Sequence, residues 1–218
     1  MVTKSKYFLL LCYINSITNG NRIVAEAQRR FELYTSGTDK SAIHPSLRAA
    51  IFGISIRYGN VVEYSAVKKE WQTTTSIDGK EICLRALARL QTPDLLSDYL
   101  SLLFHDVTMQ DLHTGAIGLA ANPKTRHGLW QYTQQNFDAI RSRLGENMVV
   151  MELFIRHSLK SFADRKTGKE IAEFFAGRDN SGYDRALEVV RDSVLARAAY
   201  RERDGTAILE WLKANGYA

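Results

Sequence analysis

The sequence predicts an all-α fold, an α-solenoid of antiparallel helix pairs with about ten or eleven helices. Apolar residues recur every three or four positions along most of the chain, and no segment shows the strict alternation of a strand. Short turn signals separate the periodic segments. Successive amphipathic helices joined by short turns bury their apolar faces on one another, as helical repeats do. No strict repeat period is visible, so a compact irregular bundle is the alternative.

The spacing of apolar residues predicts each helix in turn. The first has one apolar face made of Ile23, Ala27, Phe31 and Tyr34. The second has the same spacing, in Leu47, Ala50, Ile51, Ile54 and Tyr58. Further helices fit residues 61–73, 79–90, 94–105, 108–121, 124–143, 147–163, 167–177, 183–200 and 204–214.

The prolines agree with these boundaries. Pro45, Pro93 and Pro123 are the only prolines of the sequence, and each falls where a helix is expected to begin. Proline favours the first position of a helix because its missing N–H would have no partner there. Thr92 and Asn122 precede two of them and are the expected N-caps.

Composition excludes several classes of protein. Hydrophobic residues make up 45% of the chain and charged residues 24%, and there are only 14 glycines and 3 prolines. These values argue against a β-sandwich, a collagen-like chain and a disordered chain. Two cysteines, Cys12 and Cys83, cannot build a disulfide framework and indicate a reducing, cytoplasmic location, with a single bridge as the alternative.

Residues 1–21 form an atypical N-terminal segment. Lys4 and Lys6 precede an apolar run over residues 7–14, which is similar to a weak signal peptide without a clear cleavage site. The run is too short to cross a bilayer, which needs about 20 apolar residues, so no membrane span is expected. A buried or amphipathic helix is the favoured interpretation, and secretion is the alternative.

The positive charge of the chain is concentrated near its beginning. The net charge is +5, and residues 1–60 carry eight Lys and Arg against three Asp and Glu. A basic region attracts nucleic acid or anionic lipid. No zinc-finger spacing, Gly-rich RNA motif or block of basic residues accompanies it, so a solvated face is favoured and no nucleic-acid partner is expected.

No motif in these residues supplies a catalytic centre. The five histidines include no His-Glu-x-x-His pair, and neither a G-x-S-x-G sequence nor a phosphate-binding loop is present. His105 and His113, with Asp106 and Asp111 between them, are the nearest approach to a metal site, although such residues more often cap helices. The residues alone therefore indicate a helical binding or structural module.

Four stretches carry a family resemblance. They are IVAEAQRRFELYTSGTDKSAIHPSLRAAIFGISIRYG, EYSAVKKEWQTTTSIDGKEICLRALARLQTPDLLSDYL, GLAANPKTRHGLWQYTQQNFDAI and YRERDGTAILEWL. In this order they resemble the C-terminal helical domain of M1-family zinc aminopeptidases, with the closest similarity to the fungal and cytosolic puromycin-sensitive-like members. The resemblance runs from about Arg22 to Leu212, which makes 22–218 the expected domain.

The resemblance implies a solenoid of HEAT-like helix pairs that closes the chamber where peptides are trimmed. It places zinc, its His-Glu-x-x-His helix and the Gly-x-Met-Glu-Asn loop in earlier domains, so no cofactor and no catalytic residue is expected in these 218 residues, which should be inactive alone. The expected partners are peptides or an aminopeptidase catalytic domain. Self-association through an uncapped end of the solenoid is a further expectation.

Lys124, Arg126 and His127 are the candidate peptide-binding residues. They cluster at the expected start of a helix, where they can meet a peptide carboxylate, and a solvated surface is the alternative. A second hypothesis is a helical-repeat scaffold unrelated to proteolysis. A peptide chamber requires a polar and basic surface, whereas a protein-docking groove requires a contiguous apolar patch.

Overall fold

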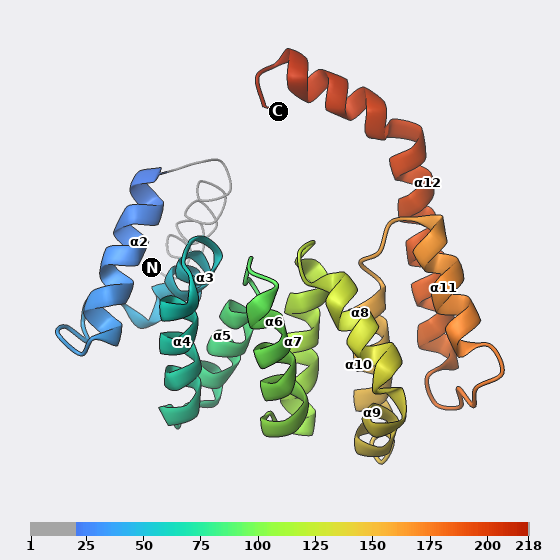
Figure 1. The fold of residues 1–218 in the computed structure, drawn as a ribbon, viewed down its shortest axis with the longest axis horizontal. Coiled ribbons are helices and arrows are strands. Elements are labelled where there is room, and N and C mark those ends of the chain that lie inside the picture. The colour runs from blue at the N-terminus through green and yellow to red at the C-terminus, as the bar shows by residue number, and fades with distance from the viewer. Residues whose placement is uncertain (1–20, 218) are drawn as a thin grey trace. The chain divides into compact units, whose positions relative to one another are not determined.

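The computed structural model describes residues 21–217, and its helices fall into two compact units (Figure 1). The first unit ends at Thr125 and the second begins at Arg126. The described residues form eleven α-helices, two short helices of other types and no strand, so the all-α prediction is confirmed. The expectations for residues 1–20, including a signal peptide or a helix, and for Cys12 lie outside the described residues.

The first unit is a series of short helices. In order they are α2 (Asn21–Thr35), η1 (Pro45–Leu47), α3 (Arg48–Tyr58), α4 (Val61–Thr73), α5 (Ile77–Leu87), α6 (Asp94–Ser101), η2 (Leu102–Asp106) and α7 (Met109–Ala121). Helix α3 packs on α2 and on α5, and α5 also packs on α4 and α7. Each helix thus buries its apolar face on a near neighbour in the chain, which is consistent with a helical solenoid.

Polar side chains in the first unit bond across helices. The Tyr64 hydroxyl donates to Asp98 at 2.7 Å, and the Lys68 ammonium reaches the same carboxylate at 2.7 Å. The buried Tyr99 hydroxyl donates to the Leu84 carbonyl at 2.8 Å. Since an unpaired buried hydroxyl would cost about 1–3 kcal/mol, these bonds fix how α4, α5 and α6 lie against one another.

Helices α5 and α7 approach closely because α7 has a glycine at the contact. A Cβ added to Gly118 would collide with the Cβ of Ala88. Just beyond α7, the Asn122 side-chain amide donates to the carbonyls of Ala88 and Leu90, at 3.1 and 2.7 Å. The end of α7 is therefore bonded to the end of α5.

The second unit contains five helices. They are α8 (Arg126–Gln135), α9 (Phe137–Leu144), α10 (Met148–Leu159), α11 (Arg165–Phe175) and α12 (Asp184–Ala214). Its core includes an aromatic cluster in which the rings of Trp130, Phe137, Phe174, Phe175 and Tyr183 meet, most of them edge to face. Trp130 also donates to Glu170 at 2.8 Å, so α8 is held on α11.

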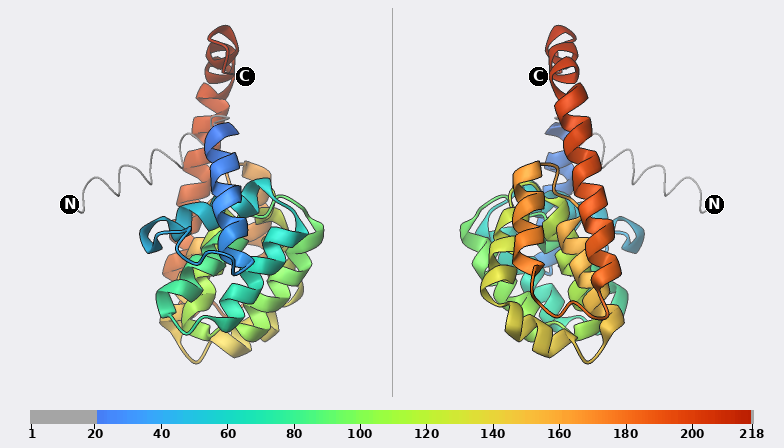
Figure 2. Two further views of the ribbon diagram at one scale, coloured as in Figure 1. Left: turned by 90° about the vertical axis from the view of Figure 1, so that its left-hand side faces the viewer. Right: turned by 90° about the vertical axis from the view of Figure 1, so that its right-hand side faces the viewer.

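Helix α12 continues well past its packed part. Its buried residues end at Ala198, and the remaining part extends beyond α11 (Figure 2). The sequence predicted a break between residues 200 and 204, and that prediction is wrong. Asp204-Gly205 is a turn signal, but a helix accommodates glycine at a cost of about 0.5–1 kcal/mol.

Other boundaries also differ from the prediction, and Thr92 is not the N-cap of α6, because Pro93 takes that position and α6 begins at Asp94. The expected helix 124–143 is two helices, separated at Asn136, whose φ of −118° leaves the helical range and whose side chain donates to the Tyr132 carbonyl. Asn122 caps no helix start, because α8 begins only at Arg126; its side-chain oxygen instead accepts from the Lys124 N–H in a turn. Pro45 does begin η1.

Candidate functional site

Three helices of the first unit surround a pocket of about 310 Å³ that is rich in arginine, here called the basic pocket. It is lined by Arg57, Arg85, Arg89, Gln91, His113, Thr114, Ile117, Gly118, Ala121, Asn122 and Pro123. Arg57 comes from the last turn of α3, Arg85 from the last turn of α5, and His113 from α7. Residues far apart in sequence therefore meet in one cavity.

Arg89 reaches the pocket across the surface of α3. A Cβ added to Gly53 would lie 2.9 Å from the Arg89 Nη1 atom, so the guanidinium rests where α3 has no side chain. Arg57 is four residues after Gly53 and lies on the same face of that helix. The Arg57 guanidinium lies over the Tyr58 ring, 5.8 Å from its centroid, and both arginines line the pocket.

The third arginine, Arg85, comes from the last turn of α5. Arg89 lies four residues further along the chain, in the turn just past the end of that helix. Cationic side chains near a helix C-terminus offset the partial negative charge of its free carbonyls. This accounts for Arg57 and Arg85 individually, but not for the convergence of three arginines on one cavity.

The wall contributed by α7 combines apolar and polar groups. Ile117 and Ala121 follow His113 at helical spacing and give this wall an apolar surface. The His113 Nδ1 atom is buried, and no described residue forms a hydrogen bond with it. The amides of Gln91 and Asn122 already donate to main-chain carbonyls, so the arginines supply the pocket's strong donors.

The basic pocket is positively charged. No Asp or Glu is among the described residues that line it. Arg85 pairs with Glu81 at 3.4 Å, but the Arg85 side chain is mostly and the Glu81 side chain partly solvent-exposed, so that pair is weak. An arginine fork matches the two oxygens of a carboxylate or phosphate, so the cavity is suited to an anionic group.

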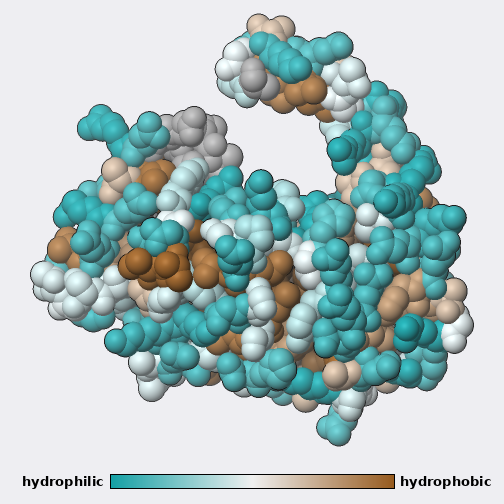
Figure 3. All heavy atoms as spheres, viewed as in Figure 1, coloured by the Kyte–Doolittle hydropathy of each residue, from teal (hydrophilic) through white to brown (hydrophobic). Residues whose placement is uncertain are grey.

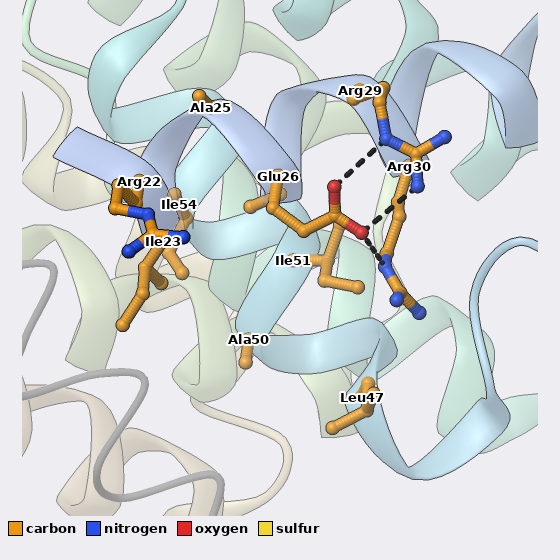
Figure 4. A pocket seen from close by; sticks show the side chains of 11 residues that line it. Arg22, Ile23, Ala25, Glu26, Arg29, Arg30, Leu47, Ala50, Ile51 and Ile54 are labelled. Atoms are coloured by element: carbon orange, nitrogen blue, oxygen red, sulfur yellow. Dashed lines mark hydrogen bonds and ion pairs between the residues drawn. The ribbon is translucent and has the colours of Figure 1, made fainter. Parts of the chain in front are cut away.

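A second pocket, larger and mostly apolar, lies between α2 and α3 and is called the apolar pocket here (Figure 4). Its volume is about 770 Å³, and its lining includes Ile23, Ala27, Leu47, Ala50, Ile51 and Ile54. On one side Glu26 bonds to Arg29 and Arg30, at 2.8 and 2.7 Å. The hydrogen bonds from Arg29 and then Arg30 lower the pKa of Glu26 to about 2, so its carboxylate stays ionised at neutral pH.

The three residues expected from the sequence to bind peptide have separate surroundings. Lys124 is exposed and directly follows Pro123, which lines the basic pocket. Arg126 donates to the Ser161 carbonyl at 3.0 Å, and burial lowers its pKa, with Arg197 nearby adding to the effect. The His127 ring meets Phe162 edge to face, with centroids 5.1 Å apart. Peptide binding by these three residues stays a prediction.

The histidines considered as metal ligands have other contacts. The His105 ring bonds to the Ser101 carbonyl at 2.9 Å, and Asp111 accepts from the Thr108 hydroxyl at 3.0 Å. Across residues 21–217, no three His, Cys, Asp or Glu side chains gather where a metal ion could bind. His113 instead lines the basic pocket.

Sequence reasoning missed the basic pocket. Only the spacing of Arg85 and Arg89, four residues apart in the chain, gave a local signal. Arg57 and His113 join them through the packing of α3 and α7 on α5, which no local pattern records.

Exposed apolar residues occur at a few places. Figure 3 shows a mainly hydrophilic face with hydrophobic residues gathered over the first helices and near the end of the chain. Val61 and Val62 are exposed at the start of α4, and Ile208, Leu209 and Trp211 near the end of α12. No helix within residues 21–217 has both the length and the apolar composition needed to cross a membrane.

Comparison with known proteins assigns the chain to a family. Residues 7–196 match the family of ERAP1-like C-terminal domains, and the chain belongs to that family. The match includes residues 7–21, which were expected to form an atypical segment, and the expected boundary at residue 22 stays a prediction.

The relatives are aminopeptidases. The chain is 32% identical to Aminopeptidase 2 of Candida albicans, over 89% of this chain and 21% of the relative. It is 29% identical to the mitochondrial Aminopeptidase 2 of Saccharomyces cerevisiae, over 88% and 20%, and 20% identical to Aminopeptidase N of Canis lupus familiaris, over 85% and 20%. The chain thus spans about a fifth of the length of these relatives, and its residues correspond to their C-terminal domain and not to their catalytic part.

Proposed function

We propose that these residues act as the non-catalytic, peptide-holding domain of an M1-type aminopeptidase. The observation that carries the proposal is the basic pocket, where Arg57, Arg85 and Arg89 converge on one cavity. A peptide-holding surface needs polar and cationic groups beside apolar contacts, and this cavity combines arginines with Ile117 and Ala121. The family match supports an aminopeptidase catalytic part as partner, because the relatives carry that name.

Lys124, Arg126 and His127 belong to the same proposal. Lys124 follows the lining of the basic pocket in the chain and is exposed, so it is the one of the three best suited to meet a peptide. Arg126 already donates to a main-chain carbonyl. Its contribution to peptide binding would therefore be smaller than that of Lys124.

The first experiment measures hydrolysis of a leucyl-anilide by the purified chain with added zinc, with and without a chelator. The expected result is no turnover by the chain alone. Chelator-sensitive turnover that co-purifies with the chain would overturn the proposal, and His105 and His113 would then be the first residues to replace.

The second experiment tests the partnership. The chain is added to Candida albicans Aminopeptidase 2 from which the matching C-terminal fifth has been removed. Peptide trimming is expected to rise on addition, and the two proteins should co-elute in gel filtration. Co-elution without any change in trimming would argue for docking alone.

A helical-repeat scaffold unrelated to proteolysis is the second candidate, and the apolar pocket favours it. Apolar pockets of this size also mark protein-docking surfaces, and a second copy of the chain is one occupant. If this reading is correct, Ile51→Glu should abolish self-association measured by sedimentation, whereas Arg57→Gln should leave it unchanged. A monodisperse monomer at high concentration would count against self-association.

A cytoplasmic location completes the proposal. Cys83 is a free, buried thiol, as expected in a reducing compartment. Fractionation of cells that express the tagged chain, with marker proteins for each compartment, tests this location.

A further inference from the structure

We propose that the apolar pocket between α2 and α3 is the docking site for the chain's own apolar run at residues 7–14. The docked run covers the pocket, so another protein reaches this surface only after the run is displaced. The inference does not rest on peptide holding, because it concerns a different pocket of the first unit. A second copy of the chain is the competing occupant, and the test separates the two.

The first step of the argument is the position of α2 at the beginning of the described helices. Among these helices α2 packs mainly on α3, whereas α3 and α5 each pack on two or more helices. The apolar pocket lies along α2 and α3, with Ile23, Ile51 and Ile54 in its lining (Figure 4). In a helical repeat each helix buries its apolar surface on segments close to it in the chain. The segment expected to cover this surface is therefore the one that precedes α2.

The second step is the composition of residues 7–14. Their sequence, YFLLLCYI, consists only of apolar and aromatic residues, so the run has no polar face. A segment that is hydrophobic all round is normally buried. The family match begins at residue 7, the first residue of the run, so the run lies within the matched domain. It needs an apolar surface of that domain to cover it.

The third step is the short connection between the run and the pocket. Only residues 15–20 separate the run from Asn21, the first residue of α2. Asn19-Gly20, at the end of this connection, is a turn signal, because both residues tolerate the left-handed backbone conformation that tight turns use. Ile23 lines the pocket just after it. A reversal of the chain at Asn19-Gly20 is therefore enough to direct the run back along α2 and over the pocket.

The fourth step favours the chain's own run over a second copy. A short flexible connection holds a tethered segment near its site at an effective concentration on the order of 1 mM. A second copy present at about 1 μM would compete at a disadvantage of roughly a thousandfold. The run within the same chain is therefore the favoured occupant.

The test uses the full chain and its natural Cys12, which lies in the run. Ala50→Cys and Ala25→Cys each place a second thiol in the lining of the pocket, whereas Ala49→Cys, the matched control, places one at an exposed position outside it. Under a mild oxidant, at least one lining variant should bond to Cys12 within one chain about tenfold faster than Ala49→Cys, because a disulfide requires Cα atoms within about 7 Å. Non-reducing gels and peptide mapping identify the joined thiols.

A charge placed in the run checks that its apolar side chains hold it in the pocket. Leu10→Asp, added to the faster lining variant, should slow the bond at least about tenfold, because a carboxylate resists transfer to an apolar site. Ser5→Asp adds the same charge just before the run and should leave the rate unchanged. Circular dichroism confirms that both variants stay folded.

Each outcome decides something. A rapid bond within one chain that Leu10→Asp slows supports the docked run. Bonds between Cys12 of one copy and the introduced thiol of another, at a rate that rises with protein concentration, overturn the inference in favour of a second copy. Equal rates for the control and both lining variants, no bond at all, or a bond that ignores Leu10→Asp also overturn it. None of these results affects peptide holding by the basic pocket.

Discussion

The thiol of Cys83 shows how one buried side chain responds to pH. It is fully buried in α5, and burial, with the nearby Glu70 adding to the effect, raises the pKa of the thiol from 9.0 to about 12. Thiol reagents attack the thiolate, so both burial and the raised pKa protect this residue. The amino-acid sequence alone could not show whether the Cys83 thiol is protected or reactive.

We predict that native Cys83 resists modification at mildly alkaline pH. In a Cys12→Ser variant, a disulfide reagent should react with Cys83 at least about a hundredfold more slowly in the native protein than in concentrated guanidinium chloride. Absorbance of the released thiolate measures both rates. Equal rates would mean that α5 opens readily.

The same raised pKa has a consequence for stability. Because the folded pKa of Cys83 lies above the unfolded value, the native state holds its proton more tightly. The contribution of the protonated Cys83 thiol to the stability of the native state is therefore complete below pH 9. It is lost as pH rises toward about 12. Urea unfolding across this range would show the decline.

At the scale of helices, two glycines lie inside helices but differ in the space around them: one position has no room for a Cβ and the other does. Gly118 in α7 faces Ala88, the C-cap residue of α5, with no room for a Cβ. Gly205 in α12 is open, and an added Cβ would meet only the Arg201 Cγ atom, at 3.6 Å. One glycine is required by packing, and the other merely weakens its helix.

We predict opposite signs for the same substitution at these positions. Gly118→Ala should destabilise the protein by roughly 1–3 kcal/mol, because α5 and α7 must separate. Gly205→Ala should be neutral or stabilise it by about 0.5–1 kcal/mol, because alanine favours the helix. Thermal melts followed by circular dichroism measure both, and a stabilising Gly118→Ala would contradict the close approach.

Most helices were predictable because their apolar spacing coincides with their buried face. The expected helix 61–73 matches α4 in both bounds, and the buried Tyr64, Val67 and Trp71 lie on one stripe. The failures have local causes. Asp204-Gly205 looks like a turn but continues as helix, while Asn136 divides a segment whose apolar pattern continues across it.

At the scale of the whole chain, the described residues form two units, each with its own core. Phe137 belongs to the aromatic cluster of the second unit, whereas Phe31 and Phe52 pack edge to face in the first, with centroids 5.5 Å apart. The sequence predicted one continuous domain from residue 22. The division after Thr125 has no composition change to mark it, because it follows from which helices pack together.

We predict that the units can be destabilised separately. Phe137→Ala should cost about 3–5 kcal/mol in the second unit by removing a buried ring. Hydrogen exchange followed by mass spectrometry should then rise in α8 to α11 more than in α3 to α7. An equal rise throughout would show that the chain unfolds as one cooperative body.

The candidate site was harder to predict than the fold, for a physical reason. Helix formation depends on neighbours within a few positions, so the sequence displays it directly. The basic pocket depends on Arg57, Arg89 and His113 meeting through the packing of separate helices, and also on the missing side chain of Gly53. Apart from the four-residue spacing of Arg85 and Arg89, the sequence around these residues gives no local signal.

The close approach of the Arg89 guanidinium to Gly53 has a mechanical consequence. Arg89 follows the end of α5, but its guanidinium lies on α3. A ligand that binds both Arg89 and Arg57 would therefore link these two neighbouring helices. A row of helices is elastic because each touches only its neighbours. A ligand bound in the basic pocket would restrict the relative movement of the helices that line it. The first unit would therefore bend less easily with this pocket filled than with it empty.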